Sequence, residues 1–336
     1  MSNWMRRNGV ASASLLLFLS QAQAQAIKPD DINNAVIVPA AADRSTMPAE
    51  APDRDAARHP DPAIVRLQVL LDRAGASPGV IDGFDGENVG KAISAFEAMQ
   101  DLPVDGRLDQ GVADRLSDQR PAIEPYVISK GDVEDLVSSI PKDFAEQAKM
   151  GQLGYTSITE KLAERFHMDA DLLSELNSQA RFEPGETIFV ANPGSPKQGL
   201  VKRIEAHKRT RQLLAFADDD TLVAAYPATI GSEETPSPSG TQKVKGAARM
   251  PPYTYNPKIN FRQGGNKKIM TLPGGPNNPV GTVWIDLTKP TYGIHGTPEP
   301  SLIDKSGSHG CVRLTNWDAE ELAGMVKPGV VVKFLD

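Results

Sequence analysis

Residues 292–316 read "YGIHGTPEPSLIDKSGSHGCVRLTN" and include Cys311, the only cysteine among the 336 residues. Two of the five histidines, His295 and His309, lie in the same stretch. His295 precedes the cysteine by sixteen positions (311 − 295), which is too far for neighbouring turns of one helix. The spacing fits a strand end and a loop that turns back beside it, because a histidine base must be close to the sulfur in space, not in sequence. We therefore interpret Cys311 as a free, reactive thiol that His295 activates.

This interpretation follows from the chemistry of a thiol nucleophile. A free thiol has a pKa of about 8.5 and is mostly protonated near neutral pH, so it needs a base to form the thiolate. Gly310 lets the backbone bend tightly before Cys311, and N–H groups at the bend can stabilise an oxyanion by about 3–4 kcal/mol per donor. Arg313 supplies a fixed positive charge suited to a substrate carboxylate. The pattern predicts acyl transfer through a cysteine.

The same residues also fit less reactive roles. Cys311 could be a packed core thiol, His309 could only support the loop, and Arg313 could form a surface ion pair. His295, His309 and Cys311 could also supply three metal ligands. No acidic motif nearby offers a general base for a metal-bound water, so we expect neither a metal nor another cofactor.

Residues 199–336, which surround this stretch, predict an all-β domain with long loops. "RIEAHKRTRQLLAFADDDTLVAAYPATIG" (203–231) indicates successive strands with a hairpin at "DDD", and "GTVWIDL" (281–287) indicates another strand. One helix follows the cysteine, with Thr315 and Asp318 in a capping-box-like start. "VVVKFL" (330–335) is the last expected strand.

Residues 61–118 predict a small three-helix domain. "PAIVRLQVLLDRAG" (62–75) places Ile64, Leu67, Leu70 and Leu71 on one helical face, and Gly75 ends that helix. The pattern repeats in a second helix, and a turn with a third short helix follows. The apolar positions of the second helix are Val89, Ile93, Phe96 and Met99.

A second small unit is expected at residues 151–195, with the order strand, helix, helix, strand. Its opening strand would be "TSITEK" (156–161), and His167 would be a surface residue. The expected helix core comprises Leu162, Phe166, Leu172, Leu173 and Leu176. We interpret residues 27–60 as a linker and residues 119–150 as a connector.

The N-terminus predicts export. Arg6 and Arg7 precede a short apolar run (9–20), and small residues between Ala22 and Ala26 offer cleavage sites. We interpret residues 1–26 as a signal peptide; an N-terminal membrane anchor is the alternative. The net charge of −7 leaves no basic surface for nucleic acid.

Three parts of the chain resemble known families. "YGIHGTPEPSLIDKSGSHGCVRLTN" resembles the active-site signature of the L,D-transpeptidase family. The "RLQVLLDRAG" helix (66–75) and the "AISAFEAMQDLPVDG" helix and turn (92–106) resemble a peptidoglycan-binding domain. "LAERF", "LLSELN" and "PGETIFVAN" resemble a lysin motif, for which glycan binding and a purely structural role are both open.

The first resemblance implies a role for each matching position. Cys311 would be the nucleophile and His295 its base, oriented by the backbone carbonyl of Gly296. Backbone amides near Gly310 and Cys311 would form the oxyanion hole. The substrate site would be lined by Ser308, His309 and Arg313. The implied fold is a β-sandwich-like catalytic domain, so the whole chain is expected to be multidomain, with the three-helix domain and a small α+β segment beside it.

The resemblance also implies an activity and a place. The thiolate would attack a peptidoglycan stem tetrapeptide, release D-alanine and pass the acyl group to an amine in the periplasm. The acceptor stays open: a neighbouring stem, water, or a lysine of a wall-anchored lipoprotein. A wall-binding protein with a degenerate catalytic domain is the non-enzymatic alternative. Acylation of Cys311 by a carbapenem-type inhibitor would distinguish the two classes.

Overall fold

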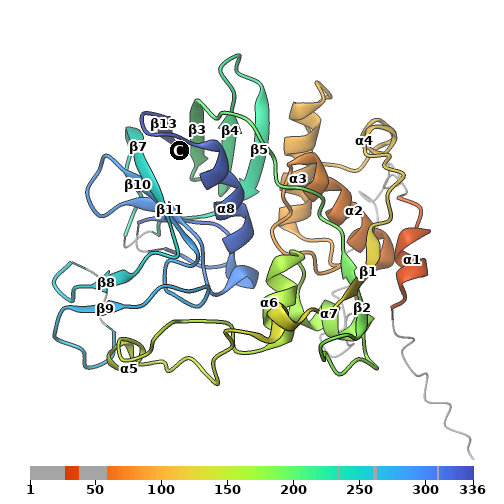
Figure 1. Cartoon of the computed structure of the whole chain (residues 1–336). Helices are drawn as coiled ribbons and strands as arrows, with labels where there is room; N and C mark the ends of the chain where they lie inside the picture. Colours follow the sequence, from red (N-terminus) through yellow and green to blue (C-terminus); the bar gives the residue numbers. More distant parts are fainter. Residues whose placement is uncertain (1–26, 38–58, 233–234, 260–262, 309) are drawn as a thin grey trace, which may run out of the picture.

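The computed structural model describes residues 27–37, 59–232, 235–259, 263–308 and 310–336. The expected signal peptide, residues 38–58 of the expected linker, and His309 lie outside this part of the chain. A β-rich half and a helical half meet along helix α8 (Asn316–Met325) (Figure 1). The prediction of a multidomain chain with a three-helix domain and a mostly β domain is confirmed. Within the described ranges, no helix combines the length and apolar character that crossing a bilayer requires.

The β-rich half is built on one nine-stranded sheet in the order β5-β4-β3-β13-β7-β10-β11-β12-β6. The long strand β7 is shared, since its first part pairs with β13 and its second part with β10. The C-terminal strand β13 is inserted beside β3, so the sheet is completed by the last residues of the chain. The strands are β3 (Arg203–His207), β4 (Gln212–Phe216), β5 (Leu222–Pro227), β6 (Thr229–Ile230), β7 (Gly240–Arg249), β10 (Val283–Leu287), β11 (Gly293–His295), β12 (Val312–Arg313) and β13 (Val331–Leu335).

The core of this half lies between the sheet and α8. Alternate residues of the strands are buried there, as period-two patterning requires. Thr315 caps α8 by accepting a hydrogen bond from the backbone N–H of Asp318 at 3.2 Å, and Leu322 and Met325 are buried. The carboxyl of Asp318 does not complete a capping box; it accepts a hydrogen bond from Ser77 of the helical half at 3.1 Å.

The three-helix domain comprises α2 (Pro62–Ala74), α3 (Glu87–Met99) and α4 (Gln110–Arg115). α2 ends where Gly75 adopts the left-handed conformation (φ 90°), as predicted. The expected apolar face of α2 packs against α3, but Val65 and Val69 are also fully buried on its other side. α2 therefore belongs to two cores at once.

The second small unit has the expected order of strand, helix, helix and strand, but its first strand lies at other residues than predicted. "TSITEK" starts helix α6 (Ile158–Arg165), because the hydroxyl of Ser157 caps the backbone N–H of Glu160 at 3.0 Å. The strand that pairs with β2 (Thr187–Ala191) is β1 (Ile123–Val127), inside the expected connector. α7 (Ala170–Leu176) follows α6. Between β1 and α6 lie the short 3-10 helix η1 (Lys130–Val133) and α5 (Phe144–Gln147).

The linker prediction is wrong for residues 29–33. They form α1 (Pro29–Asn33), and Ile32 is fully buried in the core shared by α2, β1, α6 and α7. The Asn33 amide bonds both backbone groups of Ile123, at 2.9 and 2.8 Å. These contacts hold α1 against the start of β1.

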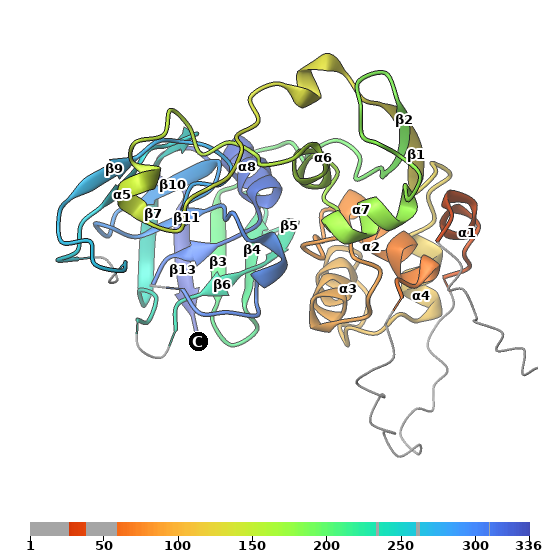
Figure 2. The same cartoon turned by 90° about the horizontal axis from the view of Figure 1, so that it is seen from below.

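The units are joined by shared packing. Residues Gly75 and Ser77 extend the edge of the catalytic sheet through backbone hydrogen bonds of 2.8 and 2.9 Å to Ala225 in β5. α5 packs against the two-stranded sheet of β8 (Tyr253–Tyr255) and β9 (Met270–Leu272) (Figure 2). His167 is not a simple surface residue: its ring stacks on Trp317 at 5.1 Å and its Nδ1 lies 2.7 Å from Asp72. The smaller units are therefore built onto the β-rich half.

Candidate active site

The strand register places Cys311 and His295 on one face of the sheet. β11 and β12 are parallel, with Ile294 opposite Val312 and His295 opposite Arg313. Ile294 and Val312 are fully buried in the core, so their chain neighbours Cys311 and His295 face the other way. Parallel neighbouring strands thus bring together two residues that are sixteen positions apart in the chain (311 − 295).

The imidazole of His295 is held in one tautomer. Its Nδ1 lies 2.7 Å from the carbonyl oxygen of Gly296, which can only accept a hydrogen bond, so Nδ1 carries the proton. Burial, followed by the positive charge of Arg313, lowers the pKa of His295 to about 4. The ring stacks on Trp284 at 5.4 Å and is 4% exposed. At neutral pH the ring is uncharged, with a free lone pair on Nε2.

Cys311 is partly exposed and has no disulfide partner. Its sulfur contacts the carbonyl oxygen of Thr291 at 3.8 Å. Burial raises the pKa of the thiol, whereas a hydrogen bond from the Gly293 backbone and the charge of Arg313 lower it. The resting pair is therefore a neutral thiol and a neutral imidazole, not a thiolate and an imidazolium.

A tight turn presents the thiol. Gly310 has a φ of 101°, and a Cβ at this position would lie 2.7 Å from the ring of Tyr292. The hydroxyl of Ser308 accepts hydrogen bonds from Gly231 (2.7 Å) and Gly310 (3.3 Å) and donates to the Cys311 carbonyl at 2.5 Å. Ser308 is 2% exposed. Its buried hydroxyl therefore holds the turn, and the expectation that Ser308 lines the substrate site stays a prediction.

The amide of Gly310 is likewise engaged by Ser308, which leaves the Cys311 N–H as the better candidate for an oxyanion donor. His309 lies outside the described residues. Arg313 is half-buried, opposite His295, and its charge acts on Cys311. These positions put a fixed cation beside the nucleophile.

Two residues at the site were not found from the sequence. Tyr253 in β8 faces the site: burial and then the charge of Cys311 raise its pKa to about 12, while Arg313 lowers it. Asn316, the first residue of α8, accepts hydrogen bonds from the backbone of Thr282 and Thr297, each at 3.1 Å. The alternation of "YTY" was the only local signal for Tyr253, and "LTN" after the cysteine the only one for Asn316.

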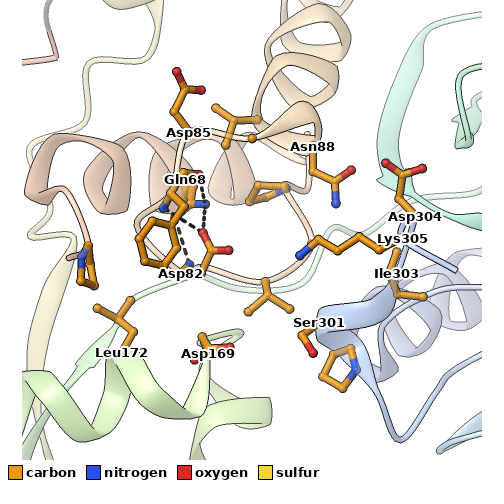
Figure 3. A pocket seen from close by; sticks show the side chains of 18 of the residues that line it. Gln68, Asp82, Asp85, Asn88, Asp169, Leu172, Ser301, Ile303, Asp304 and Lys305 are labelled. Carbon is orange, nitrogen blue, oxygen red and sulfur yellow. Dashed lines mark hydrogen bonds between the residues drawn. The ribbon is translucent and has the colours of Figure 1, made fainter. Parts of the chain in front are cut away.

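Two hollows lie between the units, and neither is lined by Cys311 or His295. One of about 770 Å³ separates the three-helix domain, α7 and the loop that carries η2 (Pro300–Leu302) (Figure 3). Asp82 in this hollow is bonded to Gln68 at 2.8 Å and thus supports the local turn. The other, of about 800 Å³, lies where α6 and α8 approach each other. In the part of the chain that the structure describes, no group of three His, Cys, Asp or Glu side chains is arranged to hold a metal ion.

A free thiol on the same face of the sheet as a neutral, oriented imidazole is an arrangement that can support acyl transfer through a cysteine. Comparison with known proteins agrees with this chemistry. Residues 201–333 match the family model of the L,D-transpeptidase catalytic domain, and residues 60–116 match that of a peptidoglycan binding domain. The chain belongs to the L,D-transpeptidase family, whose members are cysteine-dependent acyltransferases.

Individual relatives give the extent of the similarity. YkuD of Bacillus subtilis, named as an L,D-transpeptidase, is 30% identical over 173 residues, which cover 51% of this chain and 89% of YkuD. YbiS of Escherichia coli, also named as an L,D-transpeptidase, is 29% identical over 196 residues, covering 54% of this chain and 61% of YbiS. A solved structure of L,D-transpeptidase 3 from Mycobacterium tuberculosis aligns with a TM-score of 0.33 at 17% identity, over 46% of this chain and 72% of that one.

Proposed function

We propose that the protein cross-links peptidoglycan by an L,D-transpeptidation with Cys311 as nucleophile and His295 as base. The observation that carries the proposal is the uncharged, carbonyl-oriented imidazole on the same face of the sheet as the only thiol. Because Nδ1 carries the proton and donates to Gly296, Nε2 is the atom that can accept the thiol proton.

The first half-reaction forms a thioester. The Cys311 proton passes to His295, and the sulfur attacks the carbonyl carbon of the third residue of a stem tetrapeptide. The oxyanion is stabilised by the backbone N–H of Cys311, and Arg313 attracts a carboxylate of the donor stem. The carbon–nitrogen bond to the terminal D-alanine then breaks, and the leaving amine takes the proton from His295.

The second half-reaction transfers the acyl group. The amine of a neighbouring stem gives a proton to His295 and attacks the thioester carbon, which expels the sulfur as a thiolate. His295 then returns the proton to the sulfur of Cys311. The energy of the peptide bond is conserved in the thioester, so no nucleotide is consumed. Water in place of the amine gives a tripeptide, and a lysine of a wall-anchored lipoprotein gives a protein–wall link.

We place the enzyme in the periplasm, where residues 1–26 would direct it and be removed. There the three-helix domain would hold the enzyme on its polymeric substrate and raise the local concentration of stems. We retain residues 61–118 and 199–336 as the binding and catalytic domains. The lysin-motif-like unit extends from β1, at residue 123, to β2, and its shared core favours a structural role.

The test is mass spectrometry of disaccharide-tetrapeptide muropeptides incubated with the wild-type protein and with Cys311→Ala. Dimers that have lost D-alanine, absent with the variant, are the expected products. Tripeptide monomers without dimers would contradict the proposal and would indicate a carboxypeptidase activity. A carbapenem should add its mass to the wild-type protein and leave Cys311→Ala unmodified; labelling of the variant would contradict the assignment of the nucleophile.

A further inference from the structure

The amide of Asn316 ties together the backbone next to His295. Its oxygen accepts hydrogen bonds from Thr282 and Thr297, each at 3.1 Å. Thr297 lies two residues after His295, and Gly296 between them supplies the carbonyl that orients the imidazole. A Cβ on Gly296 would lie only 2.2 Å from the amide oxygen of Asn316. The position of this amide therefore sets the position of the histidine loop.

The other end of the same amide is held by a residue of a different unit. The nitrogen of Asn316 donates to both carboxyl oxygens of Glu164 in α6, at 3.1 and 2.9 Å, and is 3.3 Å from the carbonyl of Pro276. Tyr155 donates to Glu164 at 3.2 Å. Asn316 is 2% exposed and Glu164 is 9% exposed, so both groups of this contact are buried.

Only one orientation of the Asn316 amide satisfies these partners. Backbone N–H groups lie on one side and acceptors on the other, so a flipped amide would set its NH₂ group against the donors of Thr282 and Thr297. The carboxyl of Glu164 supplies the main acceptors on the nitrogen side. Without it, a buried NH₂ group would keep only Pro276.

We propose that Glu164 is a positioning residue for His295, acting through Asn316, so that α6 of the lysin-motif-like unit completes the active site. The inference rests on the proposed role of His295 and deepens it. The unit that contains α6 is then part of the catalytic scaffold. Glu164, which is 152 residues before Asn316 in the sequence, thus holds the loop that selects the imidazole tautomer.

The protonation state of Glu164 suggests a conservative variant. The pKa of Glu164 is raised to about 8, mainly by burial and to a smaller extent by the charges of Glu160 and Glu320. The hydrogen bonds from Asn316 and Tyr155 lower it in part. At neutral pH the group is mostly uncharged. The amide of Glu164→Gln has the same size, keeps an acceptor oxygen for Asn316 and can donate to Tyr155.

The first experiment compares Glu164→Ala, Glu164→Gln and the wild-type protein on soluble muropeptides, with Leu173→Ala as control. Leu173 is fully buried in the core of the same unit and does not contact Asn316. We expect Glu164→Ala to lower kcat by about 10- to 100-fold with little change in KM, since displacement of a catalytic group by about 1 Å has effects of this size. Glu164→Gln should recover most of kcat. Leu173→Ala should lower Tm at least as much but keep kcat.

A second experiment exchanges the hydrogen-bond donor and acceptor between residues 316 and 164. It can be carried out even if Glu164→Ala does not fold. Asn316→Asp replaces the donor by an acceptor, so the two hydrogen bonds to Glu164 are lost and kcat should fall by at least about 10-fold. Adding Glu164→Gln lets the new amide donate to the new carboxyl, which still accepts from Thr297, so kcat should rise again by at least about 10-fold. The rate at which a carbapenem acylates Cys311, measured by intact-protein mass spectrometry, should fall and rise in parallel with kcat.

The outcomes separate this inference from the proposed function. A wild-type protein that yields neither dimers nor tripeptides would overturn the proposed function, and this inference with it. An active wild type beside an equally active Glu164→Ala would overturn only the inference. Equal losses of kcat in Glu164→Ala and Leu173→Ala, or no recovery in the double variant, would likewise reduce Glu164 to a structural residue.

Discussion

Replacing Glu164 by glutamine should make the protein more stable at alkaline pH than at acidic pH, relative to the wild type. In the folded protein the pKa of Glu164 is raised from 4.5 to about 8, mainly by burial. The folded state thus binds the proton more tightly than the unfolded state. Stability from this proton is complete below pH 4.5 and is lost as the pH rises through 8. Glutamine has no proton to lose.

The size of the effect follows from the two pKa values. Between pH 5 and pH 8 the wild type should lose about 3.5 kcal/mol of unfolding free energy through this group, at 1.36 kcal/mol per pKa unit. At roughly 2 °C per kcal/mol, the Tm of the variant should gain about 7 °C on the wild type over this interval. Tyr155, Glu160 and Glu320 also face the site but are present in both proteins, so their titration largely cancels in the difference.

The assay is differential scanning calorimetry of both proteins at pH 5, 6, 7 and 8 in buffers of equal ionic strength. Glu134→Gln, which removes an exposed carboxyl from a turn outside this contact, is the control. A Tm difference between Glu164→Gln and wild type that stays constant with pH would refute the reasoning, because it would mean that Glu164 is ionised throughout and is not a buried neutral acid.

Three further results are expected. Gly310→Ala should lower kcat by about 100-fold, since its φ of 101° disfavours a side chain and the new Cβ would meet the Tyr292 ring at 2.7 Å; a fully active variant would contradict this turn geometry. Iodoacetamide should alkylate Cys311 at pH 7 more slowly than it alkylates free cysteine, because burial raises the pKa of this thiol. Mass spectrometry measures the rate of alkylation, and an equal or higher rate would indicate a resting thiolate. Phe144→Ala should destabilise the protein by about 3–5 kcal/mol in urea unfolding, because Phe144 is buried. It should also raise KM more than it lowers kcat, because Phe144 packs edge-on to Tyr253, with 6.2 Å between the ring centres. An unchanged KM would show that α5 does not contribute to substrate binding.

The sequence by itself determined the features that depend on local pattern. The period of apolar residues predicted α2 and α3 and the alternating strands of the catalytic domain, because helix and strand faces repeat at fixed spacings. The histidine, the glycine before the cysteine and the lone thiol predicted the chemistry. These signals are short in range, and "SHGC" and "IHG" carry them within a few residues.

Tertiary structure decided the contacts between distant segments. The first strand of the second small unit is β1, separated from the helices of that unit by residues 128–157, and no periodicity spans such an insertion. Val65 and Val69, which lie outside the predicted apolar face of α2, are buried in a second core. The hydroxyl of Ser308 has three backbone partners that the sequence did not indicate.

The hydrogen bonds that position the loop beside His295 are the clearest example of contacts that the sequence could not predict. Glu164 in the sequence is one acidic residue of an amphipathic helix, and such residues usually face solvent. Only the packing of α6 against α8 buries it opposite Asn316, where both carboxyl oxygens meet the amide nitrogen. A hydrogen bond depends on distance and angle between atoms in space, and residues 152 positions apart acquire that geometry only when the whole chain has folded.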